Sequence, residues 1–128
     1  MYRDGFKKVP SDTYVGINAA SKSALLGDLT TAQAIATDVL ARLDEARKER
    51  KGAPAKDYWE RVTEPEALLL KGDHPRALSL YHEARIANQH EAGSIESTAK
   101  QVRRLLTVLP VDPETRKALT EEFALEGA

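Results

Sequence analysis

Apolar side chains recur three and four positions apart along most of this chain, which is the spacing of one buried helix face. The clearest stripe lies between positions 95 and 109, and comprises Ile95, Thr98, Ala99, Val102, Leu105, Leu106 and Leu109. An earlier stripe comprises Ala32, Ile35, Ala36, Val39, Leu40 and Leu43. Little in the sequence favours strands, so the pattern predicts an all-α protein.

Turn and capping residues divide this pattern into a short segment at 2–8 and six longer helices. The longer helices are expected at 12–26, from 30 or 31 to 47, and at 57–71, 75–89, 95–109 and from 112 onward, with Gly93 closing a turn. The string from Thr63 to Glu66 has the form of a capping box with Pro65 in the first turn. It predicts that the fourth helix restarts or kinks at Thr63. Asp112 followed by Pro113 predicts the start of the last helix, which is expected to bury Leu119 and Phe123.

Two parts of the chain repeat at a constant separation of 45 residues. Gly27-Asp28 returns as Gly72-Asp73, and the matching continues upstream and downstream. The further matched pairs are Tyr14 with Trp59, Ile17 with Val62, Ala24 with Leu69, Ala32 with Ala77, and Ala36 with Tyr81. A repeat of this length is typical of helix pairs that stack because neither can bury its apolar face alone. The expected architecture is therefore a right-handed solenoid of antiparallel helix pairs, with about six to seven helices.

The second half of each repeat resembles the tetratricopeptide family. The matching residues are Gly27-Asp28, Ala32 and Ala36 in one copy, and Gly72-Asp73, Ala77, Tyr81 and Ala84 in the other. Tyr2 lies 34 residues before Ala36, with Pro10 eight positions later, as in the tail of one more such repeat. The chain is therefore expected to be a single helical-repeat domain, 1–128, cut from a longer protein. Its expected parts are the tail 1–10, the repeat units 12–51 and 57–91, and capping helices at 94–125.

The first half of each repeat departs from the tetratricopeptide pattern, because this chain has Gly16 and Arg61 at the positions where that family usually has tryptophan. It carries the string Tyr14 to Ala20 in one copy, and Asp57-Tyr58-Trp59 with Thr63, Glu66 and Ala67 in the other. This combination resembles the TRAF-binding helical-repeat domain of the apoptosis signal-regulating kinases and its bacterial relatives, over roughly 2–106. The resemblance implies a regulatory, protein-binding part of a larger signalling protein. It does not imply a TRAF partner, and no kinase motif is present.

The composition is that of an ordinary globular chain. The 128 residues are 41% hydrophobic and 30% charged, with a formal net charge of −1 and no cysteine. The absence of cysteine excludes disulfides, thiolate metal sites and a thiol nucleophile. No apolar run approaches the roughly 20 residues of a membrane helix, and the charge balance disfavours nucleic acid. A cytoplasmic protein without a membrane or nucleic-acid partner is expected.

The candidate binding site is the concave face that the first helices of the pairs would line. Tyr14 and Trp59 occupy matched positions there and are either anchors for a bound protein or peptide, or core between the repeats. Polar residues expected to share this face are Asn18, Ser21, Thr63 and Glu66. The truncated first repeat, with Tyr2, would expose apolar surface and could support self-association.

A second candidate is a basic patch of Lys100, Arg103 and Arg104, which lies opposite the apolar stripe of its helix. It is either a docking patch for an acidic partner or a solvated helix face. For catalysis the sequence offers only Ser97 and Lys100 in a Ser-x-x-Lys string without its partner motifs. The three histidines lack the spacing of a helical metal pair. No catalytic residue, metal or cofactor is expected.

These observations favour a non-catalytic protein-interaction or regulatory module of a larger protein. The alternative is a helical spacer that braces neighbouring domains and has no free ligand. An enzyme would need converging polar groups that the sequence does not show.

Overall fold

The computed structural model describes residues 9–49, 51 and 58–125, with the side chains of 9–14 and 59 excepted. In this part the chain forms helices and no strand, which confirms the all-α prediction. The helices are α2 (Val9–Leu25), α3 (Leu29–Glu49), α4 (Tyr58–Lys71), α5 (His74–Ala87), α6 (Ala92–Leu106) and α7 (Pro113–Glu122). The predicted segment at 2–8 lies outside the described residues. None of the described helices is long and apolar enough to cross a membrane.

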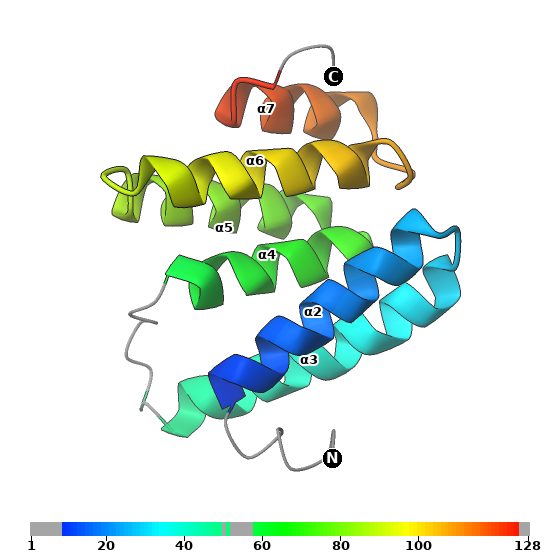
Figure 1. Ribbon diagram of the computed structural model, residues 1–128, viewed down its shortest axis with the longest axis vertical. Helices are drawn as coiled ribbons and strands as arrows, with labels where there is room; N and C mark the ends of the chain where they lie inside the picture. The colour runs from blue at the N-terminus through cyan, green and yellow to red at the C-terminus, as the bar shows by residue number, and fades with distance from the viewer. Residues whose placement is uncertain (1–8, 50, 52–57, 126–128) are drawn as a thin grey trace.

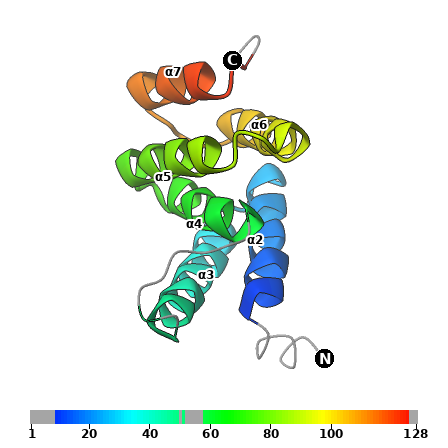
Figure 2. The same cartoon turned by 90° about the vertical axis from the view of Figure 1, so that its left-hand side faces the viewer.

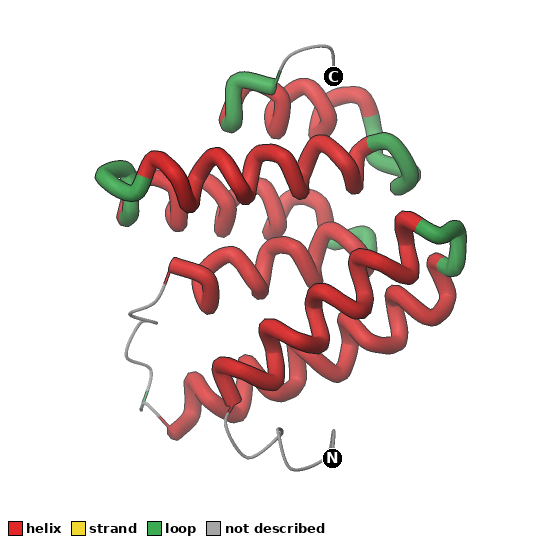
Figure 3. Tube along the Cα trace, viewed as in Figure 1, coloured by secondary structure: helices red, strands yellow, loops and turns green. Residues whose placement is uncertain are grey.

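The helices follow one another along the long axis of the molecule, from α2 and α3 at one end to α7 at the other (Figures 1 and 2). Short turns join α2 to α3 and α4 to α5, and each of these pairs packs side by side (Figure 3). Helix α4 also contacts α2, α3 and α6, whereas α7 contacts α5 and α6. Helix α4 therefore lies at the centre of the molecule.

This central position explains an error in the prediction for α4. The helix runs without interruption from Tyr58 to Lys71, so Thr63 is not an N-cap, and Pro65 lies inside the helix. A proline inside a helix removes one hydrogen bond and costs about 3 kcal/mol. The six residues from Pro65 to Leu70 are all buried, and burial of their apolar surface against several neighbouring helices offsets that loss. A helix that is apolar around most of its circumference is characteristic of a core position.

Other predicted boundaries are shifted by a few residues. Helix α2 begins at Val9 rather than Asp12, and it tolerates Pro10 because the first turn needs no amide donor at that position. Helix α6 begins at Ala92 and ends at Leu106, so Gly93 lies inside the helix instead of closing a turn. The start of α7 is as predicted, because the Asp112 carboxylate accepts a hydrogen bond from the Thr115 amide at 2.9 Å.

The two glycine turns have the same geometry. Gly27 and Gly72 adopt φ values of 90° and 93°, a region in which a side chain would be strained. The Gly27 amide donates to the Ala24 carbonyl at 3.0 Å and the Gly72 amide to the Leu69 carbonyl at 3.2 Å. The amides of the following aspartates, Asp28 and Asp73, donate to the carbonyls five residues earlier at 2.8 and 2.9 Å. Both turns are thus Schellman-type helix ends, so the two Gly-Asp strings adopt the same turn.

A close approach between α2 and α3 requires a glycine at position 16. A Cβ atom added to Gly16 would lie 2.8 Å from Cγ2 of Val39, and Val39 is buried in the core. The absence of a side chain on Gly16 therefore determines how closely these two helices pack.

A large side chain at this position should separate the helices. We expect Gly16→Leu to lower the free energy of unfolding by about 1–3 kcal/mol, as is usual for an overfilled core. Urea denaturation followed by circular dichroism measures this change. Ala19→Leu on the exposed face of α2 is the matched control, and an equal loss in both variants would contradict the proposed close packing.

Candidate functional site

Helices α2, α4 and α6 meet at one junction, where each contacts the other two. At this junction the Ser21 hydroxyl of α2 donates a hydrogen bond to Oε2 of Glu66 in α4. The Gln101 side chain of α6 donates to the same oxygen atom at 3.2 Å. One buried carboxyl oxygen therefore joins three helices. Ser21 and Glu66 are also matched positions of the repeat, 45 residues apart.

Burial determines the protonation of this carboxyl group. Desolvation raises the pKa of Glu66, and the hydrogen bonds from Ser21 and Gln101 only partly oppose the shift. No ion pair to Glu66 is found in the described part of the chain. Glu66 is therefore a buried carboxyl group that is hydrogen-bonded by two neutral side chains and has no cation beside it among the described residues.

More polar atoms are buried next to this junction. The Tyr58 hydroxyl donates to Oγ1 of Thr98 at 2.9 Å, which adds a second polar contact between α4 and α6. The Tyr81 hydroxyl of α5 is fully buried and has no hydrogen-bond partner within residues 9–49, 51 and 58–125. Desolvation, with smaller contributions from Glu66 and Tyr58, raises the pKa of Tyr81 well above its usual value.

This arrangement corrects part of the predicted concave site. Ser21, Thr63 and Glu66 are only 1%, 3% and 8% exposed, so these side chains do not lie on an open face. Ser21 and Glu66 are buried where α2, α4 and α6 contact one another. Asn18 is exposed as expected. The side chains of Tyr14 and Trp59 lie outside the described residues, so their role stays a prediction.

The predicted basic patch is present on the surface of α6. Lys100, Arg103 and Arg104 are all exposed. Lys100 lies 3.7 Å from Glu96 on the same helix, and both side chains are more than 60% exposed. Such a pair contributes little stability. Arg103 and Arg104 form no ion pair with other described residues.

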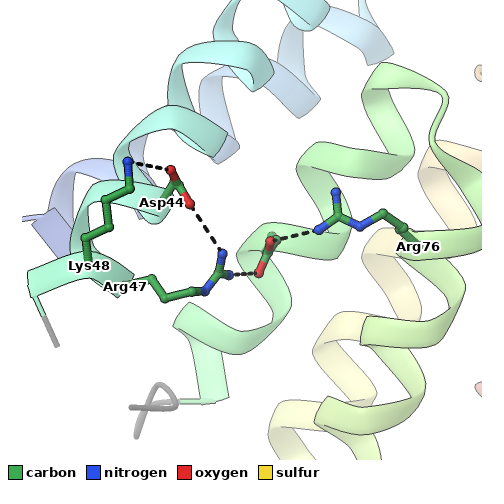
Figure 4. A network of polar contacts seen from close by, with 5 residues as sticks. Asp44, Arg47, Lys48 and Arg76 are labelled. Atoms are coloured by element: carbon green, nitrogen blue, oxygen red, sulfur yellow. Dashed lines mark hydrogen bonds and ion pairs between the residues drawn. The ribbon is translucent and has the colours of Figure 1, made fainter. Parts of the chain in front are cut away.

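Sequence reasoning missed a cluster of ion pairs that joins three helices. Glu64 of α4 lies 2.6 Å from Arg47 of α3 and 3.7 Å from Arg76 of α5. Arg47 also pairs with Asp44, which in turn pairs with Lys48 (Figure 4). Glu64 is 16% exposed, so it is screened less than its partners. The sequence around Glu64 does not indicate these ion pairs, because Arg47 and Arg76 are distant from it along the chain.

A second missed set of contacts joins α5 to α7. His74 lies 3.2 Å from Asp112, and His82 lies 2.8 Å from Glu122, which also binds Arg85. Hydrogen bonds from Thr115, with a smaller one from His74, lower the pKa of Asp112 to about 2. Burial opposes ionisation of Glu122, but Arg85 and His82 lower its pKa overall. These pairs attach the two ends of α7 to α5.

The described residues contain no group of three or more side chains suited to bind a metal ion. Comparison with protein families, curated proteins and solved structures finds no match to this chain. The contacts described above are therefore the basis for assigning a function.

The buried carboxyl group gives the stability of this protein a specific pH dependence. Because the pKa of Glu66 is raised by folding, its favourable contribution is complete below the unfolded pKa, near about 4.3. That contribution is lost as the pH rises through the folded pKa. We expect Glu66→Gln, which does not titrate, to gain stability over the natural chain as the pH rises. Urea denaturation of both proteins at a series of pH values above 5 measures the difference, and a constant difference would contradict this account.

Proposed function

We propose that this chain is a non-catalytic protein-interaction module of a larger protein, with a possible role in signalling. It would be built from tetratricopeptide-like antiparallel helix pairs that stack in a right-handed sense, and it would bind a protein or peptide in the cytoplasm. The proposal is supported mainly by features that recur 45 residues apart. Gly27 and Gly72 form equivalent turns, and the matched residues Ser21 and Glu66 contact each other.

Repeated helix pairs of this kind typically provide surfaces for other proteins, because each pair adds a similar exposed edge beside its neighbour. The resemblance to the TRAF-binding domain of the apoptosis signal-regulating kinases supports the same class of function. It leaves the partner unnamed.

A structural brace without a free ligand is the second candidate. It is favoured by the burial of Ser21, Thr63 and Glu66, since these three polar side chains were expected to contact a bound peptide. The Glu64 ion pairs across α3, α4 and α5 also suit a rigid spacer.

Affinity capture from the native host distinguishes these functions. The immobilised chain is compared with Asn18→Glu, which alters an exposed position of the predicted face, and with Ala34→Glu on the exposed side of α3 as a matched control. We expect a protein that is retained by the natural chain and by Ala34→Glu, and is lost with Asn18→Glu. If the natural chain retains no specific protein, the brace is favoured.

A further inference from the structure

The surface above the Glu66 junction combines exposed apolar side chains with positive charge. Ser21 and Gln101 donate to the same oxygen atom of Glu66, so α2 and α6 lie close together at these residues. Residues three and four positions away share a helix face with them. Asn18 and Leu25 therefore flank Ser21, and Arg104 flanks Gln101. We call this surface the α2–α6 seam. It consists of Asn18, Leu25 and Arg104 together with three exposed neighbours, namely Lys22 next to Ser21, and Leu26 and Val108 in the turns just after α2 and α6.

Exposed apolar side chains are concentrated at the seam. The described residues include five large hydrophobic side chains that are exposed, and three belong to the seam: Leu25, Leu26 and Val108. Leu26 is 77% exposed, the highest value of the five. Val15 lies on α2 as well, which leaves only Ile86 elsewhere. The C-terminal ends of α2 and α6 lie at the same edge of the molecule (Figure 1). Apolar side chains gathered in this way are typical of an interaction site.

The charge of the seam differs from that of the whole chain. The chain has 19 Lys and Arg against 20 Asp and Glu. No acidic residue occurs between positions 13 and 27 or between 97 and 111, whereas these two segments contain Lys22, Lys100, Arg103 and Arg104. Lys22, Arg103 and Arg104 form no ion pair with other described residues. Within the described part of the molecule, Lys100 pairs with Glu96, whereas the charges of Lys22, Arg103 and Arg104 are unpaired.

We infer that the α2–α6 seam docks an acidic amphipathic helix of a partner protein. Leu25, Leu26 and Val108 would contact the apolar face of that helix, while Lys22 and Arg104 would pair with its carboxylates. An apolar strip between two helices with cations at its edges suits this mode of recognition, and the charges orient the partner. The inference rests on the proposed function, and it places the binding site on the surface of α2 and α6 beside the Glu66 junction.

The test uses a synthetic helical peptide about four turns long. Its leucines are spaced three and four apart, and glutamates occupy the flanking positions. A second peptide has lysine in place of every glutamate. We expect the acidic peptide to bind the full chain and to shift the amide resonances of residues 18–26 and 97–108. Binding should weaken as salt is added, because the rim charges are exposed. The basic peptide should not bind.

Two double variants with the same charge change provide the control. Lys22→Glu with Arg104→Glu should weaken binding of the acidic peptide by about tenfold or more, equivalent to at least about 1.4 kcal/mol. Lys71→Glu with Lys117→Glu alters exposed lysines elsewhere and should leave binding unchanged. Equal effects of the two variants, or resonance shifts centred on α5 and α7, would overturn the inference.

Other occupants give different outcomes. Binding to vesicles of phosphatidylcholine and phosphatidylserine without binding of the peptide would replace the partner helix by a lipid surface. Sedimentation of a dimer that is lost with Leu26→Ser would replace it by a second copy of the chain. A host protein that is still retained by the Lys22→Glu, Arg104→Glu variant would overturn the seam but leave the proposed function intact. If the chain neither binds the acidic peptide nor retains a host protein, both the seam inference and the proposed function are overturned.

Discussion

Replacing Tyr81 by alanine is expected to lower the free energy of unfolding by about 3–5 kcal/mol, the usual loss for a buried aromatic side chain. Tyr81 is 1% exposed in α5 and contacts Phe123, just after α7, with ring centroids 5.5 Å apart and an interplanar angle of 86°. This edge-to-face contact forms part of the core beneath α7. Since the main contacts of α7 are those with α5 and α6, we expect the loss to be largest in α7.

Tyr81→Phe separates the contribution of the ring from that of the hydroxyl group. The hydroxyl has no hydrogen-bond partner among the described residues, and a buried unpaired polar group costs about 1–3 kcal/mol. We therefore expect Tyr81→Phe to leave stability unchanged or to raise it. Urea denaturation measures both variants, and hydrogen exchange of the α7 amides shows whether the loss is local. A phenylalanine variant as unstable as the alanine variant would show that the hydroxyl has a stabilising partner.

The elements of this fold were largely predictable because their signals are local. The two Gly-Asp turns were identified by glycine followed by aspartate at a fixed separation, and both have the positive φ that glycine permits. Asp112 was predicted as an N-cap, and Leu119 and Phe123 are buried as expected. These features depend on residues only a few positions apart, so the sequence contains the information directly.

Pro65 was misjudged because its environment is not local. A capping box and a continuous helix are both compatible with the string from Thr63 to Glu66, and only burial of α4 on several sides selects the helix. The four apolar residues from Ala67 to Leu70 were a signal of that burial, since an exposed helix would be polar on one side.

The candidate site was predictable only in part. The 45-residue repeat placed Ser21 and Glu66 at matched positions, and matched positions of adjacent pairs can contact each other. The contribution of α6 could not be predicted, because the hydrogen bond from Gln101 in α6 to Glu66 in α4 joins positions 35 residues apart without a repeat relation. The face therefore looked open from the sequence, although three of its polar residues are buried. The basic residues of α6 were predicted correctly to be exposed, because their spacing opposite the apolar stripe is a local property.

Glu66→Ala is expected to lower the free energy of unfolding at pH 5 by about 2–4 kcal/mol, since it leaves two donors without their acceptor in a closed site. Ser21, at 1% exposed, cannot recover its hydrogen bond from water, whereas Gln101 is only partly buried and recovers some of its own. The truncation also leaves a cavity where α2, α4 and α6 meet.

Three further variants, Glu66→Gln, Ser21→Ala and the double change, test whether the loss comes from these hydrogen bonds. Glu66→Gln keeps an acceptor oxygen for Ser21, so at pH 5 it should lose much less stability than Glu66→Ala. Ser21→Ala removes one donor from the Glu66→Ala background, and the loss caused by the double change should be smaller than the sum of the two single losses, because the orphaned hydroxyl is gone. Urea denaturation measures the free energy of unfolding of all four variants and of the natural chain. Strict additivity of Ser21→Ala and Glu66→Ala would mean that the two side chains do not interact, and the hydrogen bond between α2 and α4 would then contribute nothing to stability.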